Sequence, residues 1–241
     1  MLKGEKRYRV AFFCVVTLII IFIWIGPVNA WASMPANKKI VVIDAGHGEW
    51  DPGMFHSKIK EKDINLVITE KLQLLMELGG AVVLTTRSDD TALADKKRAD
   101  LSARANIANA AGADIYLSIH QNSFASADVS GAQVFYHASS ESSKVLAEFI
   151  QDRLNNFIGD HQGKPRTRPA KASETYYVLK KTNMPAVIVE CGFMSNYRDL
   201  KLLQEDNFQD KIAWAVYMGV MDYFMHIEKP NPPKPIDGIK E

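Results

Sequence analysis

From residue 38 onward, short apolar runs rich in Val and Ile alternate with longer stretches in which apolar residues recur at helical spacing. The short runs predict strands at residues 39–44, 81–85, 115–119, 133–136 and 187–189. The longer stretches predict helices at residues 63–78, 98–110, 142–158 and 208–225, the first with a broad apolar stripe from Ile64 to Leu78. Strands separated by helices favour right-handed crossovers. We therefore expect an α/β fold: a single domain with a twisted, mostly parallel sheet flanked by helices on both faces.

The first 32 residues have a different pattern from this domain. Basic residues gather within residues 1–9, an uncharged apolar run extends from Val10 to Gly26, and residues 30–32 have the small-x-small spacing that signal peptidase recognises. The run is long for a signal peptide and slightly short for a membrane span of about 20 residues. We interpret residues 1–32 as a signal peptide or, alternatively, as an N-terminal membrane anchor. Both interpretations predict that the following domain is exported and acts outside the cytoplasm.

The composition limits the size of the core and the kinds of partner that we expect. The chain has 241 residues, 47% of them hydrophobic, which is enough for one substantial core. Its 29 basic and 28 acidic residues nearly balance, so nothing predicts a nucleic-acid partner. Cys14 lies in the apolar run and Cys191 is alone in the domain, where we interpret it as a packed core thiol. Residues 229–241 hold four prolines and few apolar residues, which predicts a Pro-rich C-terminal tail.

Three predicted strands end in residues that suit catalysis by a metal. His47 follows the strand at residues 39–44, His120 follows the strand at 115–119, and Glu190 follows the strand at 187–189. If these strands are parallel neighbours, the three side chains meet at one edge of the sheet, where open α/β sheets bind their ligands. Two imidazoles and a carboxylate at such an edge suit a Zn²⁺ site with an open position for water and a base close by.

A third protein ligand for the metal is needed, and the nearby acidic candidates are Glu49, Asp51, Glu61 and Asp63. Glu61 lies just before the helix predicted at residues 63–78, so its simplest role is to interact favourably with the helix N-terminus. A helix start packed against the sheet would nevertheless hold Glu61 more rigidly than the loop holds Glu49 or Asp51. Spacing alone therefore only favours Glu61.

The order of the motifs resembles a known family. These motifs are Asp44-Ala-Gly-His47-Gly, Asp51-Pro-Gly53, Glu61-Lys-Asp63, Leu101-x-x-Arg104, Ser118-Ile-His120-x-Asn122 and Val189-Glu190-x-Gly-Phe193. In this order they resemble the zinc-dependent N-acetylmuramoyl-L-alanine amidases of the Amidase_3 family, over roughly residues 38–224. The resemblance implies a zinc amidase catalytic domain at residues 38–226. It also implies that His47, Glu61 and His120 bind Zn²⁺ and that Glu190 is the catalytic carboxylate.

The resemblance further implies a substrate and a role. The bond cut would join the lactyl group of N-acetylmuramic acid to L-alanine in peptidoglycan, so that the stem peptide and muramic acid are what the enzyme binds. The motifs are most similar to the germination-specific amidases of the spore cortex, whose product is later converted to muramic lactam. Two departures from the family pattern lie between the first two ligands: Glu49 stands where a glycine is usual, and residues 54–56 are bulky.

Several alternatives stay open from the residues alone. Asn122 could orient the substrate or cap its loop, and Arg166 and Arg168 could contact a substrate carboxylate or lie in solvent. The same constellation could serve another zinc-dependent cell-wall hydrolase, a peptidase or deacetylase, or the domain could be a non-catalytic peptidoglycan-binding module. The presence of His47, Glu61, His120 and Glu190 argues against the binding module, because a protein that only binds peptidoglycan needs neither metal ligands nor a base. Membrane association through residues 1–32 and a regulatory protein partner are also left open.

Overall fold

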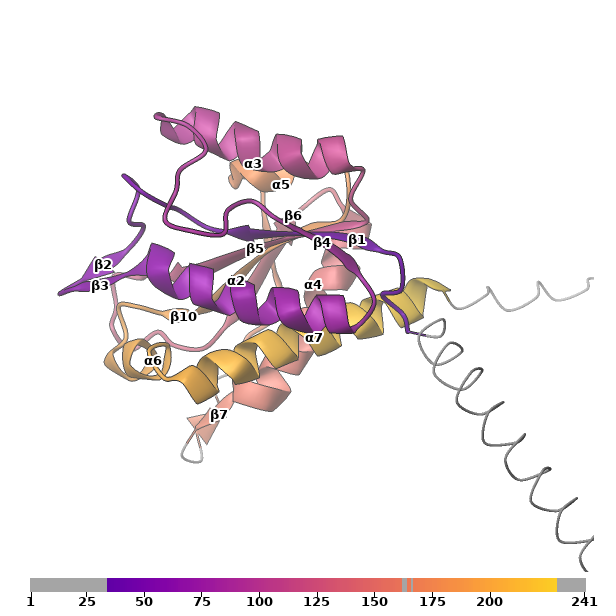
Figure 1. Ribbon diagram of the computed structural model, residues 1–241. Helices are drawn as coiled ribbons and strands as arrows, with labels where there is room; N and C mark the ends of the chain where they lie inside the picture. The colour runs from indigo at the N-terminus through magenta and orange to yellow at the C-terminus, as the bar shows by residue number, and fades with distance from the viewer. Residues whose placement is uncertain (1–33, 162–163, 166, 229–241) are drawn as a thin grey trace, which may run out of the picture.

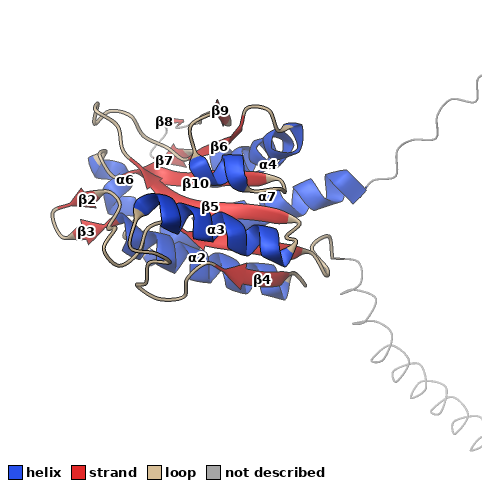
Figure 2. Cartoon of the chain, turned by 90° about the horizontal axis from the view of Figure 1, so that it is seen from above, coloured by secondary structure: helices blue, strands red, loops and turns tan. Residues whose placement is uncertain are grey.

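The computed structural model describes residues 34–161, 164–165 and 167–228 and has one sheet of six strands at its centre (Figures 1 and 2). The strands lie in the order β4-β1-β5-β10-β6-β9. Their bounds are β1 Ile40–Ala45, β4 Val82–Thr85, β5 Ile115–Asn122, β6 Gln133–His137, β9 Lys171–Ser173 and β10 Ala186–Phe193. The expected single α/β domain with a central sheet is therefore confirmed.

Most neighbouring strands of this sheet run parallel. β1 pairs in parallel with both β4 and β5, and β5 pairs in parallel with β10. β6 is antiparallel to β10, and β9 continues the sheet in parallel with β6. The central strand β10 is buried over its whole length, whereas Val82 on the edge strand β4 is exposed. The consequence for function is that β1, β5 and β10 end side by side.

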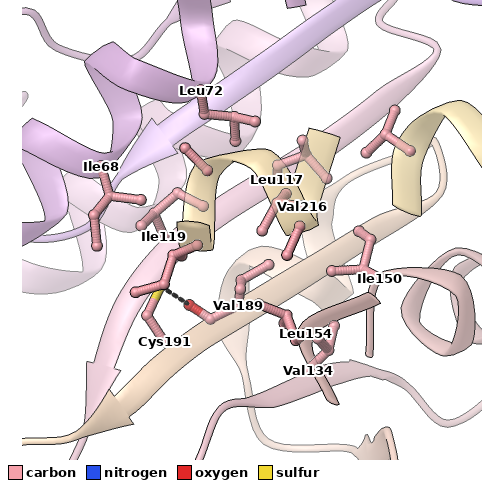
Figure 3. Close-up of a cluster of buried hydrophobic side chains, with 14 of the residues drawn as sticks. Ile68, Leu72, Leu117, Ile119, Val134, Ile150, Leu154, Val189, Cys191 and Val216 are labelled. Carbon is pink, nitrogen blue, oxygen red and sulfur yellow. Dashed lines mark hydrogen bonds between the residues drawn. The ribbon is translucent and has the colours of Figure 1, made fainter. Parts of the chain in front are cut away.

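Helices cover both faces of the sheet, as the alternating pattern predicted (Figure 1). The helices are α2 Glu61–Leu78, α3 Lys97–Ala111, α4 Glu141–Ile158, α5 Tyr177–Lys181, α6 Tyr197–Leu202 and α7 Asp206–Glu228. α2, α4 and α7 lie on one face, while α3 and α5 lie on the other. Figure 3 shows the larger core cluster, in which Leu117, Val189 and Cys191 meet side chains from α2, α4 and α7.

The face of α2 that packs on the sheet differs from the predicted stripe. The helix begins at Glu61 rather than at residue 63. Ile64 is buried as expected, but the rest of the buried line is Ile68, Leu72 and Met76, at intervals of four residues. The side chains of Leu74 and Leu78, which the stripe included, are each 58% exposed. Because α2 contacts the sheet on one side and α7 beside it, apolar residues further round the helix remain in solvent.

Two short hairpins complete the described part of the chain. β2 Phe55–His56 and β3 Ile59–Lys60 form a hairpin directly before α2. β7 Asp160–His161 and β8 Lys164–Pro165 form the second, after α4. None of the described helices is both long enough and apolar enough to cross a membrane. The signal or anchor expected at residues 1–32 and the tail expected at residues 229–241 lie outside the described residues.

Candidate metal centre

The ends of three neighbouring strands bring His47, His120 and Glu190 to one edge of the sheet. In the pairing of β1 with β5, Ala45 lies opposite Ile119, so His47 and His120 follow closely on adjacent strands. On the other side of β5, Glu190 of β10 lies directly opposite His120. These strands are thus the parallel neighbours that the sequence pattern required.

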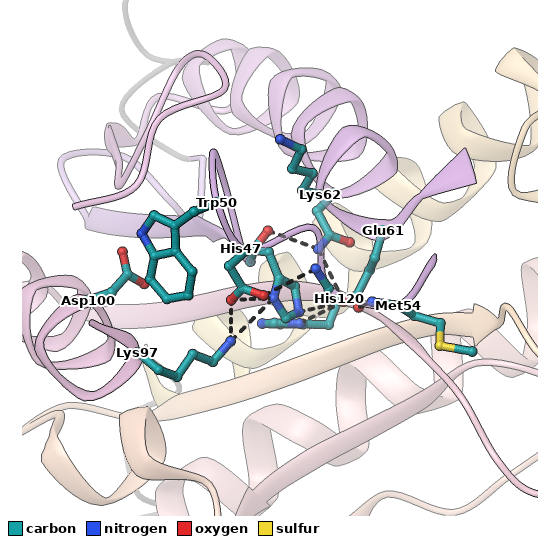
Figure 4. A network of polar contacts seen from close by, with 12 residues as sticks. His47, Trp50, Met54, Glu61, Lys62, Lys97, Asp100 and His120 are labelled. Carbon is teal, nitrogen blue, oxygen red and sulfur yellow. Dashed lines mark hydrogen bonds and ion pairs between the residues drawn. The ribbon is translucent and has the colours of Figure 1, made fainter. Parts of the chain in front are cut away.

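Glu61 completes a group of three side chains that point toward one another (Figure 4). Its Oε1 lies 3.2 Å from Nε2 of His47 and 2.9 Å from Nδ1 of His120. One potential ligand atom from each residue lies within 4.8 Å of the others, and the two imidazole rings meet edge to face. Of the four acidic candidates that the sequence offered, the structure places Glu61 between the two histidines.

The Glu61 carboxylate is held by backbone and side-chain donors. Its Oε2 accepts a hydrogen bond at 2.8 Å from the backbone amide of Met54. Met54 belongs to the loop that folds back from β1. Oε1 of Glu61 also accepts from the Gln121 amide and from the Asn65 side chain. Burial raises the pKa of Glu61, but His120 and His47 outweigh this effect and hold the pKa well below its usual range. Glu61 is therefore a fixed carboxylate at neutral pH.

His47 is oriented by contacts on its ring and on its backbone. Its Nδ1 lies 2.8 Å from Oδ2 of Asp51, and Lys97 forms an ion pair with the same carboxylate. With Nδ1 bound to Asp51, Nε2 is directed toward Glu61. The backbone of His47 is left-handed, with φ of 65°, a conformation that non-glycine residues rarely adopt. Arg104 donates a hydrogen bond to the His47 carbonyl at 2.7 Å and so supports this conformation.

Two glycines make room for the imidazole and carboxylate groups. A Cβ added at Gly46 would lie 2.3 Å from the His120 ring, which shows how closely the ring packs on the backbone. At Gly53, where φ is +66°, an added Cβ would lie 2.4 Å from Oε2 of Glu61 and 2.7 Å from the His47 ring. Only glycine fits at these two positions, because a larger residue would displace the side chains that converge at the site.

This donor set fits a catalytic zinc ion. Zn²⁺ takes imidazole nitrogen and carboxylate oxygen ligands, and catalytic zinc sites keep three protein ligands and an open position. Burial lowers the pKa of His47, but Glu61 and Asp51 outweigh this and raise it, so a metal at Nε2 competes with a proton. The residues that could hold the metal are therefore His47, Glu61 and His120.

A buried ionic network surrounds Asp44 near the carboxyl end of β1. Asp44 accepts hydrogen bonds from four side chains, which come from α3, from β5 and from the end of β4: Thr86, Arg104, Tyr116 and Ser118. Arg104, 2% exposed, also bonds Asp100 and the backbone carbonyls of Ala45 and His47. The network therefore ties α3 to the end of β1, where the chain turns into His47.

Glu190 faces the same cavity as the three candidate ligands. The cavity has a volume of about 480 Å³, and its lining includes all four of these residues. Glu190 is 6% exposed, and its Oε2 has no hydrogen-bond partner within the described part of the chain. Burial and the nearby charge of Glu61 raise the pKa of Glu190 to about 8, while the Tyr176 hydroxyl acts in the opposite direction. An unpartnered carboxyl group with this pKa is suited to accept and return a proton.

The other candidate residues from the sequence do not belong to the group of potential metal ligands. Asn122 lines the cavity, and its Oδ1 also caps the loop by accepting from the Ser123 amide at 2.8 Å. Arg168 is half-buried over the Phe193 ring, and Arg166 lies outside the described residues. Cys191 is buried in the core, where burial raises the pKa of its thiol, in keeping with a packed core thiol.

Sequence reasoning did not single out two residues that the structure places at the site. Tyr176 lines the cavity beside Glu190, but it comes from an irregular segment before a short helix, where no spacing marks it. Lys97, at the start of α3, forms an ion pair with Asp51, which is distant in the sequence. Arg104 appeared only as part of a motif, and its contacts with Asp44 could not be inferred from spacing.

Comparison with known proteins identifies the family of the chain. The family model described as N-acetylmuramoyl-L-alanine amidase matches residues 41–222. The chain is 34% identical over 210 residues to a germination-specific N-acetylmuramoyl-L-alanine amidase of Bacillus subtilis, covering 84% of this chain and 86% of that protein.

Solved structures show the same fold. The CwlD amidase of Clostridioides difficile, solved in complex with the GerS lipoprotein, superposes with a TM-score of 0.72 at 37% identity and covers 78% of this chain and 100% of that one. The catalytic domain of CwlV, an amidase of Bacillus (Paenibacillus) polymyxa var. colistinus, superposes with a TM-score of 0.69 at 30% identity and covers 78% of this chain and 98% of that one. The chain therefore belongs to the Amidase_3 family of N-acetylmuramoyl-L-alanine amidases.

Proposed function

We propose that this amidase is a zinc-dependent hydrolase that cleaves the bond between the lactyl carboxyl group of N-acetylmuramic acid and L-alanine in peptidoglycan. The observation that carries the proposal is the convergence of His47, Glu61 and His120 within 4.8 Å, with Glu190 lining the same cavity. When bound there, Zn²⁺ would supply the Lewis acidity that activates a water molecule and polarises the amide carbonyl.

In this mechanism Glu190 moves the proton. Its Oε2, which no group of the described chain occupies, accepts a proton as water attacks the amide carbon. The protonated Glu190 then gives that proton to the departing nitrogen of L-alanine, so that the C–N bond breaks and a neutral amine leaves. Burial raises the pKa of Glu190 above its usual range, which suits a group that first accepts a proton and then returns it. His47, Glu61 and His120 keep the reacting groups in place throughout.

Asn122 is proposed as a contact for the substrate. It follows His120 by two residues on β5 and lines the cavity, so its side-chain amide is available to an amide or hydroxyl group of the substrate. Replacing Asn122 with Ala is then expected to raise KM more than it lowers kcat. A zinc content equal to that of the wild type would separate this role from a role in metal binding.

The cell-biological role proposed is maturation of the spore cortex. The support is similarity to a germination-specific amidase, together with motifs of the same type. Removal of the stem peptide leaves the muramic acid free for deacetylation and lactam formation. Deletion of the gene in its host should then give spores whose cortex lacks muramic lactam, while a cortex with unchanged lactam would contradict this role.

The proposal also includes export of the chain and a regulatory protein partner. Residues 1–32 are proposed to direct the chain out of the cytoplasm, either as a cleaved signal or as a membrane anchor, and residues 38–226 form the catalytic domain. A similar amidase was solved in complex with a lipoprotein, which supports a regulatory protein partner for this chain as well. N-terminal sequencing of the exported protein would tell a cleaved signal from an anchor.

The deciding experiment is digestion of purified peptidoglycan with residues 33–241 and zinc, followed by mass spectrometry of the soluble products. The proposal predicts free stem peptides with N-terminal alanine and glycan strands without peptides. A wall peptidase would instead release cut peptides, a deacetylase would release acetate, and a binding module would release nothing. Glu190→Ala should retain zinc but lose activity by about 10²- to 10⁴-fold, whereas His47→Ala should lose zinc.

A further inference from the structure

Tyr176 is fixed beside the strand that carries Glu190. It precedes α5, whose Val178 and Leu179 are buried in the core cluster on that face of the sheet. The Tyr176 ring meets the Phe135 ring edge to face, with centroids 5.3 Å apart. Phe135 lies opposite Ile188, two residues before Glu190. The ring is therefore held by the same antiparallel pair of strands that positions the carboxylate.

Tyr176 faces the cavity that holds the reacting groups. It lines the cavity together with Glu61 and Glu190 and interacts with the Glu190 side chain. Burial and these two carboxylates raise its pKa, so the hydroxyl stays protonated and is a hydrogen-bond donor. The Oε2 atom of Glu190 has no hydrogen-bond partner among the described residues.

We propose that Tyr176 is a positioning residue for Glu190, whose carboxylate it orients by donating a hydrogen bond. A carboxylate held in this way cannot rotate freely, and Oε2 remains available to take the proton from the attacking water. Tyr176 itself neither gains nor loses a proton, so the proton balance of the reaction is unchanged. The inference rests on the proposed function, because it assigns a task to Glu190 in that reaction.

Replacement of Tyr176 with Phe tests this role while it keeps the ring and its contact with Phe135. Hydrogen bonds to charged groups are among the stronger ones, so kcat is expected to fall about 10- to 100-fold. KM, zinc affinity and Tm should match the wild type, because neither substrate binding nor the metal group depends on this hydroxyl. Tyr217→Phe is the control: Tyr217 packs beside Trp214 on α7, and its variant should keep wild-type kcat.

The kinetics of Tyr176→Phe either support or contradict the positioning role of Tyr176. A kcat for Tyr176→Phe within twofold of the wild type would overturn the inference. So would a loss of zinc affinity or of Tm that accounts for the lower kcat, since Tyr176 would then act as a structural residue. If the wild type itself released no peptide from peptidoglycan, the proposed function would fail, and this inference with it. A lower kcat with unchanged KM, zinc affinity and Tm supports it.

Discussion

Replacement of Arg104 with Met removes the cation from the buried network around Asp44 at the carboxyl end of β1. Methionine fills much of the same space but donates no hydrogen bonds. The change deletes the contacts to Asp44, Asp100 and the carbonyls of Ala45 and His47, which measure between 2.6 and 2.8 Å. Asp44, 1% exposed, would then be a buried carboxylate without its counter-charge.

The size of the effect follows from this burial. Removing one partner of a buried ion pair typically costs about 3 to 5 kcal/mol, because the other charge is left uncompensated. A domain of this kind has a free energy of unfolding of about 5 to 15 kcal/mol in total. In a domain of 150 to 250 residues each kcal/mol lowers Tm by about 2 to 4 °C, so Tm should fall by about 6 to 20 °C. Zinc affinity should fall too, because the His47 carbonyl loses its donor.

The assay is urea unfolding of the wild type and of Arg104→Met, with zinc affinity measured by chelator competition. Arg153→Met is the control, because Arg153 pairs with Asp222 at a more exposed position between α4 and α7. That pair should contribute no more than about 1 kcal/mol. A loss below 1 kcal/mol for Arg104→Met, or a loss equal to that of the control, would refute the reasoning from burial.

Three further predictions follow from the same region. Asp51→Asn should weaken zinc binding about 10- to 100-fold in a chelator competition, because Asp51 orients the His47 ring, and unchanged affinity would contradict that role. Glu49→Gly should raise the free energy of unfolding by about 1 kcal/mol, since Glu49 has a left-handed φ of 48°, and Glu49→Ala should give no such gain. Burial raises the pKa of Asp44, but contacts with Arg104, Ser118 and Thr86 outweigh this effect. They hold the pKa of Asp44 well below its usual value, which is about 3.9 in the unfolded chain. The stabilisation is therefore complete above about pH 5 and declines as the pH falls further, and urea unfolding of Asp44→Asn should show a flatter dependence between pH 5 and pH 2.

The sequence predicted the edge of the sheet where the site lies because that prediction needed only strand ends. Apolar runs that end in His47, His120 and Glu190 are local signals, and parallel pairing of β1, β5 and β10 carries them to the same edge. The choice of Glu61 was weaker. It depends on the way the loop from β1 folds back so that the Met54 amide bonds the Glu61 carboxylate.

Other features depend on contacts between distant segments. The apolar run of β6 contains nothing that specifies its direction, and its antiparallel pairing with β10 is set by the tertiary fold. The stripe of α2 was misjudged because Leu74 and Leu78 continue the helical spacing although only the line through Ile68 and Leu72 faces the sheet. Tyr176 reaches the cavity through packing on Phe135, which no sequence interval records.

The alternation of side chains along β10 links correct folding to catalysis. Glu190 points into the cavity, whereas its neighbour Cys191 belongs to the core cluster on the opposite face (Figure 3). A slip of the strand by one residue would exchange the two faces. The carboxylate would then enter an apolar interior, and a thiol, a strong zinc ligand, would face His120. Misfolded copies would thus carry a metal-binding sulfur in place of the carboxylate that we propose as the base, so the energetic barrier against that slip would also prevent a metal-trapped form.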